Sequence, residues 1–369
     1  MTSSPRRIII LGVTGTVGVR ALQILQDSPL EWQILGVSAH SQREKMRELA
    51  PDSENHFLSS CPEQHCELLS LLRAGDYDIC LNAVVGAAGL PFSAAVLSAG
   101  CDLALANKES LVMAGSLLIS LAEESGATIV PVDSEHSAIF QCLRDGDKSI
   151  RQLLLTASGG ALRDLSLEQL DTATPELALA HPNWDMGPRI TIDSATMMNK
   201  AFEIIEAHWL FNVDACNIKV LIHRQSIIHS MVEFIDGSVI AQLGPPDMGF
   251  PLHFALHYPG RHQSQLQGFD SSLYSALTLE EPDLTRYPAL GLAENVIERG
   301  GDAGAVLNAA DEMAVAAFLD GDINFGAIHS LCAAALENCC MGSVSSIDEI
   351  IAADERTRKY CSDTMSIKS

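Results

Sequence analysis

The chain has 369 residues, of which 47% are hydrophobic, and its 47 acidic and 23 basic residues give a formal net charge of −24. This length can bury a large core and suggests two or three domains. The charge argues against nucleic acids and anionic membrane surfaces as partners, because both would be repelled. No apolar run approaches the ~20 residues of a membrane helix, and the ten cysteines contain no CxxC pair. We therefore expect a cytoplasmic protein.

Up to about residue 133, short apolar segments alternate with helical patterns. The expected strands are Arg7–Leu11, Trp32–Val37, Asp78–Ala83, Asp102–Ala106 and Thr128–Val132. Repetition of strand, helix and strand predicts a parallel sheet of the Rossmann-like kind.

The pattern then changes, with strands expected at Leu153–Thr156, Arg189–Ile192 and Lys219–Ile222 and a hairpin turning at Asp236-Gly237. Residues 259–288 are polar and contain proline, which is typical of a connection, and the alanine- and leucine-rich remainder is predicted to be helical. The fold class is α/β. It comprises a Rossmann-like parallel-sheet domain (1–133), an α+β central domain (134–258), a linker (259–288) and a C-terminal helical bundle (289–369).

The turn after the first strand is rich in glycine and reads GVTGTVG over residues 12–18. Glycines let backbone amides approach a pyrophosphate closely, and the following helix N-terminus adds unpaired N–H groups. Its position between a strand and a helix predicts a dinucleotide site, although the G-x-x-G-x-x-G spacing departs from the simple NAD pattern. The alternative is an ordinary tight turn.

The second strand ends without the carboxylate that would accept the ribose hydroxyls of NAD. The chain reads Ser38-Ala39-His40-Ser41-Gln42-Arg43 there. Neutral donors and Arg43 suit a 2′-phosphate, so NADP(H) is favoured over NAD(H). Arg43 as a solvated helix residue remains the alternative.

Asp133 and Glu135 follow the fifth strand, where an extended chain would point both carboxylates the same way. Two such acids repel each other unless a cation holds them, and their oxygen ligands suit Mg²⁺ or Mn²⁺. The alternative is an N-cap for a helix beginning near Ser137. A third acid, Glu203, is four residues after Asn199 on one predicted helix face, beside Lys200. A solvated surface pair is the competing interpretation of that segment.

Three further segments have the composition of a site. Lys108 follows the fourth strand, on the same predicted rim as the glycine turn. Ser158-Gly159-Gly160 follows a strand and predicts either an anion cradle or a plain turn. The loop from His181 to Gly187 has the composition of a lid over substrate, with Trp184 as an exposed side chain or a core residue.

The motifs GVTGTVG, LANKES, PVDSEH, SGG, HPNWDMG, ITIDSATMMNK and QLGPPDM occur in order over almost the whole chain and together resemble the 1-deoxy-D-xylulose 5-phosphate reductoisomerase family. The resemblance implies a V-shaped homodimer with an NADPH domain, a central catalytic domain and a helical bundle. It also implies a metal-dependent rearrangement and NADPH reduction of 1-deoxy-D-xylulose 5-phosphate to 2-C-methyl-D-erythritol 4-phosphate, a step of isoprenoid biosynthesis.

The resemblance also assigns residue roles. The implied metal ligands are Asp133, Glu135 and Glu203, and the implied catalytic residues are Lys108, Glu135 and His181. The implied substrate contacts are Lys108, Ser134, Glu135, Glu203 and a phosphate group of Ser158, His181, Ser194, Asn199 and Lys200. The implied NADPH contacts are Thr14, Gly15, Thr16, Val17, Asn107, Glu109 and Gly187.

This chain departs from the family pattern at His40-Ser41-Gln42, where a Gly-Lys/Arg-Asn run is common, so Arg43 is the expected substitute. Two other functions are compatible with parts of this pattern. A metal-dependent NADP(H) reductase without rearrangement would retain the carbon skeleton of its substrate. An NADPH-sensing module would bind the cofactor without turnover.

Overall fold

The computed structural model describes residues 4–143, 149–170, 172–184 and 186–368. The chain forms two compact units, and each is described by itself. Unit 1 comprises the chain up to Ser110, Leu118–Phe140 and Asp247–Gly268. Unit 2 comprises Leu111–Leu117, Gln141–Pro246 and the chain from Phe269 onward.

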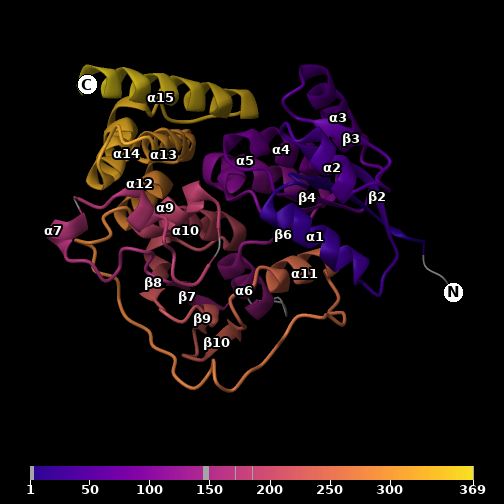
Figure 1. Ribbon diagram of the computed structural model, residues 1–369, viewed down its shortest axis with the longest axis horizontal. Coiled ribbons are helices and arrows are strands. Elements are labelled where there is room, and N and C mark those ends of the chain that lie inside the picture. Colours follow the sequence, from indigo (N-terminus) through magenta and orange to yellow (C-terminus); the bar gives the residue numbers. More distant parts are fainter. Residues whose placement is uncertain (1–3, 144–148, 171, 185, 369) are drawn as a thin grey trace. The chain divides into compact units, whose positions relative to one another are not determined.

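Unit 1 is built on a six-stranded sheet with the order β3-β2-β1-β4-β5-β6, in which every pairing is parallel (Figure 1). Its strands are β1 (Arg6–Leu11), β2 (Trp32–Ala39), β3 (His56–Leu58), β4 (Ile79–Asn82), β5 (Asp102–Leu105) and β6 (Ile129–Pro131). Its helices are α1 (Thr16–Gln26), α2 (Arg43–Leu49), α3 (Pro62–Ala74), η1 (Ala87–Gly89), α4 (Leu90–Ser98), α5 (Lys108–Ser125), α6 (Ser134–Cys142) and α11 (Gly249–His257), although parts of α5 and α6 fall in unit 2. This strand order is that of dinucleotide-binding sheets, so the predicted Rossmann-like domain is confirmed.

Continuous apolar runs explain why the sheet of unit 1 lies inside the unit. Ile8 to Leu11 of β1 have no exposed surface, and each such side chain contributes ~1.5–3 kcal/mol by burial. Leu252 and Phe254 of α11 join this core, so a helix distant in sequence completes it. All five predicted strands are present. β3 was not predicted, because three residues show no usable alternation.

Unit 2 contains a mixed sheet with the order β10-β9-β7-β8. Its strands are β7 (Ile150–Ala157), β8 (Ile218–Ile222), β9 (Ile228–Phe234) and β10 (Val239–Leu243). Its helices are α7 (Leu167–Leu170), α8 (Pro175–Ala178), α9 (Pro188–Thr196), α10 (Met198–Phe211), η2 (Ala215–Asn217), α12 (Leu290–Arg299), α13 (Ala303–Leu319), α14 (Phe325–Cys339) and α15 (Ile347–Lys368).

The hairpin in this sheet was predicted correctly. Gly237 turns the chain at φ 87°, and its N–H donates to the carbonyl of Phe234 at 2.9 Å. The four C-terminal helices form the predicted helical region, in which α13 packs against α14 and α15 (Figure 1). Among the residues that the structure describes, none of the helices is long and apolar enough to cross a membrane.

Two local predictions were wrong. The segment Arg189–Ile192 is not a strand but part of α9, which Gly187 caps with extended backbone and Pro188 opens at its first position. The helix expected near Ser137 begins at Ser134 instead, so Glu135 is helical and does not form an extended pair with Asp133. The Oδ1 atom of Asp133 accepts the backbone N–H of Glu135 at 3.3 Å, so the capping role holds beside any other role.

Candidate active site

The glycine turn of unit 1 is shaped by close backbone packing. Gly12 adopts φ 79°, and a Cβ at this position would lie 2.5 Å from the carbonyl oxygen of Ala83. A Cβ on Gly18 would lie 2.5 Å from the carbonyl oxygen of Gly12. Gly15 is different, because it is exposed and a Cβ there would meet nothing nearer than 3.4 Å. Two glycines therefore form the turn, and the third leaves an open cradle at the start of α1 that fits a pyrophosphate.

A lysine that was not predicted contacts this turn. Lys45 of α2 donates from Nζ to the carbonyl oxygen of Thr14 at 2.9 Å. Arg43 is the first residue of α2 and is half-buried. Both cations follow the end of β2, where a dinucleotide ribose lies in this class of sheet. In the sequence, the presence of a second cation two residues after Arg43 could have indicated that Lys45 belongs to this site.

Asn107 is a structural residue at the end of β5. It is buried, and its Nδ2 atom lies within hydrogen-bonding distance of the carbonyl oxygens of Val84, at 2.8 Å, and Gly86, at 3.0 Å. The same atom lies 2.7 Å from Oε2 of Glu109. The side chains of Asn107 and Glu109 thus hold the loop after β4 against the start of α5.

The next residue, Lys108, forms the central ion pair of unit 1. Its Nζ lies 2.7 Å from Oδ2 of Asp133, and both side chains are about nine-tenths buried. Burial alone would raise the pKa of Asp133. The charge of Lys108 and the nearby imidazole of His136, whose Nδ1 lies 3.6 Å from Oδ1 of Asp133, outweigh burial and hold that pKa well below its usual range. Asp133 is therefore ionised at neutral pH.

Glu135 is two residues after Asp133, in the first turn of α6, and accepts a hydrogen bond from the hydroxyl of Ser134. Asp133 and Glu135 thus offer oxygen ligands at the carboxyl end of β6. Hard oxygen donors of this kind fit Mg²⁺ or Mn²⁺.

A second polar group lies in unit 2 around the loop after β7. The Nδ1 atom of His181 accepts the backbone N–H groups of Asn183, at 3.2 Å, and Trp184, at 3.0 Å. The ring proton is therefore on Nε2, which donates to the hydroxyl of Ser158 at 2.9 Å. Burial, with a contribution from the charge of Arg163, lowers the pKa of His181 to about 4. His181 is neutral at physiological pH.

Arg163 contacts the same loop and was not assigned a role from the sequence. It donates from Nη1 to the carbonyl oxygen of Ser158 at 2.7 Å. A Cβ on Gly159 would lie 3.2 Å from its side chain. Trp184 is half-buried, with its ring centroid 6.4 Å from that of His229. Asp185 of the predicted lid lies outside the described residues.

The start of α10 carries the third predicted acid. Glu203 and Lys200 are almost fully buried and form an ion pair, and Asn199 donates to the other oxygen of Glu203. Lys200 also donates to the carbonyl oxygen of Thr156 at 2.5 Å. The expected helix face is therefore confirmed, but the lysine and the acid are not a solvated surface pair. Ser194 lies in the last turn of α9.

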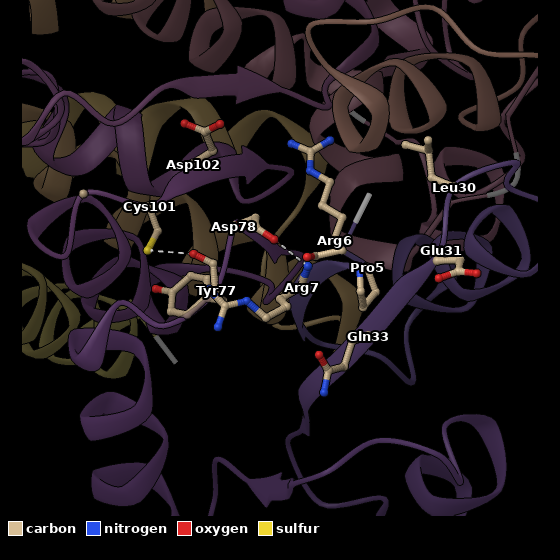
Figure 2. Close-up of a pocket in the computed structure, with 12 residues that line it drawn as sticks. Pro5, Arg6, Arg7, Leu30, Glu31, Gln33, Tyr77, Asp78, Cys101 and Asp102 are labelled. Carbon is tan, nitrogen blue, oxygen red and sulfur yellow. Dashed lines mark hydrogen bonds between the residues drawn. The ribbon is translucent and has the colours of Figure 1, made fainter. Parts of the chain in front are cut away.

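A cavity of about 990 Å³ in unit 1 lies at the amino ends of the strands, away from the glycine turn and Asp133 of the same unit. Figure 2 shows Arg6, Tyr77, Asp78, Cys101 and Asp102 lining it. Ligands of open parallel sheets bind at the carboxyl ends of the strands, so we assign no ligand to this cavity.

The dinucleotide cradle on this sheet, with two carboxyl groups and a lysine at the same rim, defines an NAD(P)-dependent oxidoreductase. Family models match residues 8–73 and 62–115 (1-deoxy-D-xylulose 5-phosphate reductoisomerase), 129–211 (its C-terminal domain) and 243–360 (DXP reductoisomerase C-terminal domain). The chain belongs to the 1-deoxy-D-xylulose 5-phosphate reductoisomerase family.

Relatives and solved structures agree with this assignment over nearly the full length. The reductoisomerase of Methylobacillus flagellatus is 43% identical and covers 96% of each chain. That of Pseudomonas aeruginosa strain PAO1 is 42% identical over 96% of this chain and 97% of its own. The Zymomonas mobilis enzyme in complex with NADPH has a TM-score of 0.89 at 37% identity, covering 98% and 99% of the two chains. A reductoisomerase solved with NADPH, fosmidomycin and magnesium has a TM-score of 0.91 at 36% identity, covering 98% of each.

The family resemblance, fold class and enzyme class predicted from the sequence are confirmed. The chain is an NADP-dependent oxidoreductase that converts 1-deoxy-D-xylulose 5-phosphate to 2-C-methyl-D-erythritol 4-phosphate, in isoprenoid biosynthesis, with NADPH and a divalent metal ion.

Proposed function

We propose that Asp133, Glu135 and Glu203 hold the divalent ion of this reaction, and that the ion is Mg²⁺. The observation that carries the proposal is the buried pair of Lys108 and Asp133 beside Glu135, at the rim where the glycine turn also opens. The carboxylate set suits Mg²⁺, and a related reductoisomerase was solved with magnesium. Mn²⁺ has the same ligand preferences and is the alternative.

When bound, the metal supplies electrophilic stabilisation of the substrate's ketone and hydroxyl oxygens. Lys108 adds a fixed positive charge at the reacting oxygens and donates hydrogen bonds to them from its ammonium group. Ser134 and Glu135 orient the substrate beside these oxygens. NADPH, when bound, would supply the hydride that reduces the aldehyde formed by rearrangement of the carbon skeleton.

We propose that the phosphate group of the substrate binds in unit 2. Ser158, His181, Ser194, Asn199 and Lys200 offer hydroxyl, imidazole, amide and ammonium donors, which suit a phosphate dianion. His181 is neutral and donates from Nε2, so it contributes a hydrogen bond rather than a charge before substrate binds. The loop from His181 to Gly187 would cover the substrate and exclude water from the hydride.

We propose that NADPH binds along the glycine turn. The expected contacts are Thr14, Gly15, Thr16, Val17, Asn107, Glu109 and Gly187. The open cradle at Gly15 supports the contact with the pyrophosphate. The buried hydrogen bonds of Asn107 support a role in which its side chain positions the loop and its backbone faces the cofactor. Arg43 and Lys45 would bind the 2′-phosphate.

We also propose a homodimer that forms at the edge strand β10. Within the described part of the chain this strand pairs with β9 alone, and Val239, Ile240 and Leu243 are exposed apolar side chains along it. Exposed apolar strand edges favour association.

The ten cysteines are free thiols, which supports a reducing cytoplasm. We retain the division into domains 1–133, 134–258 and 289–369, with the linker 259–288, as part of the proposal.

The experiment that tests the site follows NADPH oxidation with 1-deoxy-D-xylulose 5-phosphate, with and without Mg²⁺, in wild type and Glu203→Gln. We expect the variant to lose at least ~10³-fold in kcat, because a metal ligand is removed, while the Kd for NADPH stays unchanged. Glu233→Gln is the control and should retain activity. It removes an acid of β9 that is paired with Arg151 of β7. Loss of NADPH binding in Glu203→Gln would show that Glu203 does not act as a metal ligand. A product with the original carbon skeleton would contradict the rearrangement.

A further inference from the structure

The side chain of Arg189 connects the beginning of α9 to α13 within unit 2. It donates from Nη1 to Oε1 of Glu312 and from Nη2 to Oδ1 of Asn308, both at 2.9 Å. The Nη2 atom also lies 3.3 Å from Oδ2 of Asp311. These three partners lie at i, i+3 and i+4 and share one face of α13. A planar guanidinium can bind all of them at once, which a lysine ammonium cannot do in the same geometry.

The α13 side of this cluster is in turn attached to α15. Arg358 donates from Nη2 to the second carboxylate oxygen of Glu312 at 2.5 Å and from Nε to Asp354 at 2.6 Å. Asp311 is fully buried, and the side chain of Arg189 is only 18% exposed. Removing one partner from such a cluster leaves a buried charge uncompensated, so its geometry is strongly determined.

The other end of α9 contacts the proposed phosphate site. A Cβ on Gly160 would lie 2.5 Å from the carbonyl oxygen of Ser194 and 2.7 Å from Cα of Ala195. The loop of Ser158 to Gly160 is therefore in direct backbone contact with the last turn of α9. A movement of this helix along its axis would displace both Ser194 and the loop.

Asp193, the neighbour of Ser194, extends the same cluster. Its Oδ2 atom lies 3.6 Å from Nε of Arg189, four residues earlier on α9. Asp193 also interacts with Asp311, and this interaction lowers the pKa of Asp311 against the burial that raises it. The cluster therefore spans α9 from its second residue to the residue before the proposed phosphate-binding serine.

We propose that Arg189 is a positioning residue for the phosphate group of the substrate. Its attachment to α13 sets the axial position of α9, and thereby the position of Ser194 and of the loop at Ser158. The inference rests on the phosphate site proposed above. It means that the C-terminal helices determine substrate affinity without contacting the substrate.

The test compares Arg189→Lys, which keeps the charge but loses the planar fork, with wild type. We expect the KM for 1-deoxy-D-xylulose 5-phosphate and the inhibition constant of inorganic phosphate to rise together, by at least ~10-fold. The Kd for NADPH should rise less than either constant, since only Gly187 among its expected contacts adjoins α9 and the other six lie in unit 1. Asn308→Ala removes one anchor without changing a charge and should produce a smaller rise in the same two constants.

Arg356→Lys is the matched control, because Arg356 binds Asp302 and the carbonyl oxygen of Cys339 within the C-terminal helices. It should lower Tm as Arg189→Lys does and leave both constants unchanged. Equal Tm losses with unchanged constants in Arg189→Lys would overturn the positioning role. Ser158→Ala and Ser194→Ala test the phosphate site independently of the positioning role of Arg189. If neither changes the phosphate inhibition constant, the phosphate site itself is wrong and the inference falls with it. If both raise it while Arg189→Lys does not, only the inference is wrong.

Discussion

Nζ of Lys108 lies 2.7 Å from Oδ2 of Asp133, so the lysine and the proposed metal compete for the same carboxylate. The pair also explains why Asp133 stays ionised although it is buried. A cation that binds this acid must share it with Lys108 or displace the ammonium toward the substrate.

Lys108→Met should therefore separate metal binding from chemistry. We expect kcat to fall at least ~10²-fold, because a charge that stabilises the reacting oxygens is lost. The affinity for Mg²⁺, titrated on the NADPH complex, should stay equal or increase, since the competing cation is gone. A variant that no longer binds Mg²⁺ would contradict this account of the pair.

Gly15 and Gly18 should respond differently to alanine. At Gly18 a Cβ would lie 2.5 Å from backbone atoms of Gly12 and Val13, so Gly18→Ala should lower Tm. At Gly15 the nearest atom is 3.4 Å away and the backbone is extended, so Gly15→Ala should fold normally. The added methyl group would nevertheless enter the proposed pyrophosphate cradle and raise the Kd for NADPH by ~10-fold or more. Normal NADPH affinity in Gly15→Ala would place the pyrophosphate elsewhere.

His181 should act on substrate affinity through a hydrogen bond. His181→Gln is expected to raise the KM for 1-deoxy-D-xylulose 5-phosphate by about 10-fold, the value of one good hydrogen bond to an anion. His208→Gln is the control, since His208 is bonded to the carbonyl oxygen of Val213 and stacks edge-on against Trp209. Steady-state kinetics on both variants would refute the role of His181 if they gave the same KM.

Asp311 should make the stability of the fold depend on pH. Burial raises its pKa to about 6, from an ordinary value of 3.8, although Arg189 opposes this. Between these values the folded chain binds more protons than the unfolded chain, so stability falls as pH rises through this range and is not recovered above it.

Asp311→Asn removes this dependence, because the amide stays neutral and can donate to Asp193. In thermal denaturation over the pH range, the free energy of unfolding of the variant should increase relative to that of wild type as pH rises, by up to ~3 kcal/mol. Asp322→Asn, at an exposed acid after the same helix, should show no such gain. A gain that instead grows toward acid pH would show that Asp311 is ionised more readily in the folded chain than in water.

The parts of the fold that the sequence predicted are those governed by neighbouring residues. β1 is a continuous apolar run, and the turn at Asp236-Gly237 has the residues that a tight hairpin turn requires. Arg189-Ile190-Thr191-Ile192 has the alternation of a strand, but Gly187, Pro188 and the partners of Arg189 make it helical.

The candidate site divides in the same way. The spacing of Asn199 and Glu203 places both on one helix face, so their proximity was predictable. The pairing of Arg189 with Asn308 spans 119 residues, and no local pattern signals it. The proximity of Lys108 and Asp133 was partly predictable. Parallel-strand topology predicted that both lie at one edge of the sheet, but it did not predict their ion pair.

The path of the chain between the two units limits how such a protein can be divided. The backbone passes from one unit to the other at residues 110–111, 117–118, 140–141, 246–247 and 268–269. No single cut releases either unit as a continuous polypeptide, so a truncated fragment would lack strands or helices that its own core needs. The nucleotide-binding part is therefore not a module that gene fusion or domain shuffling could exchange.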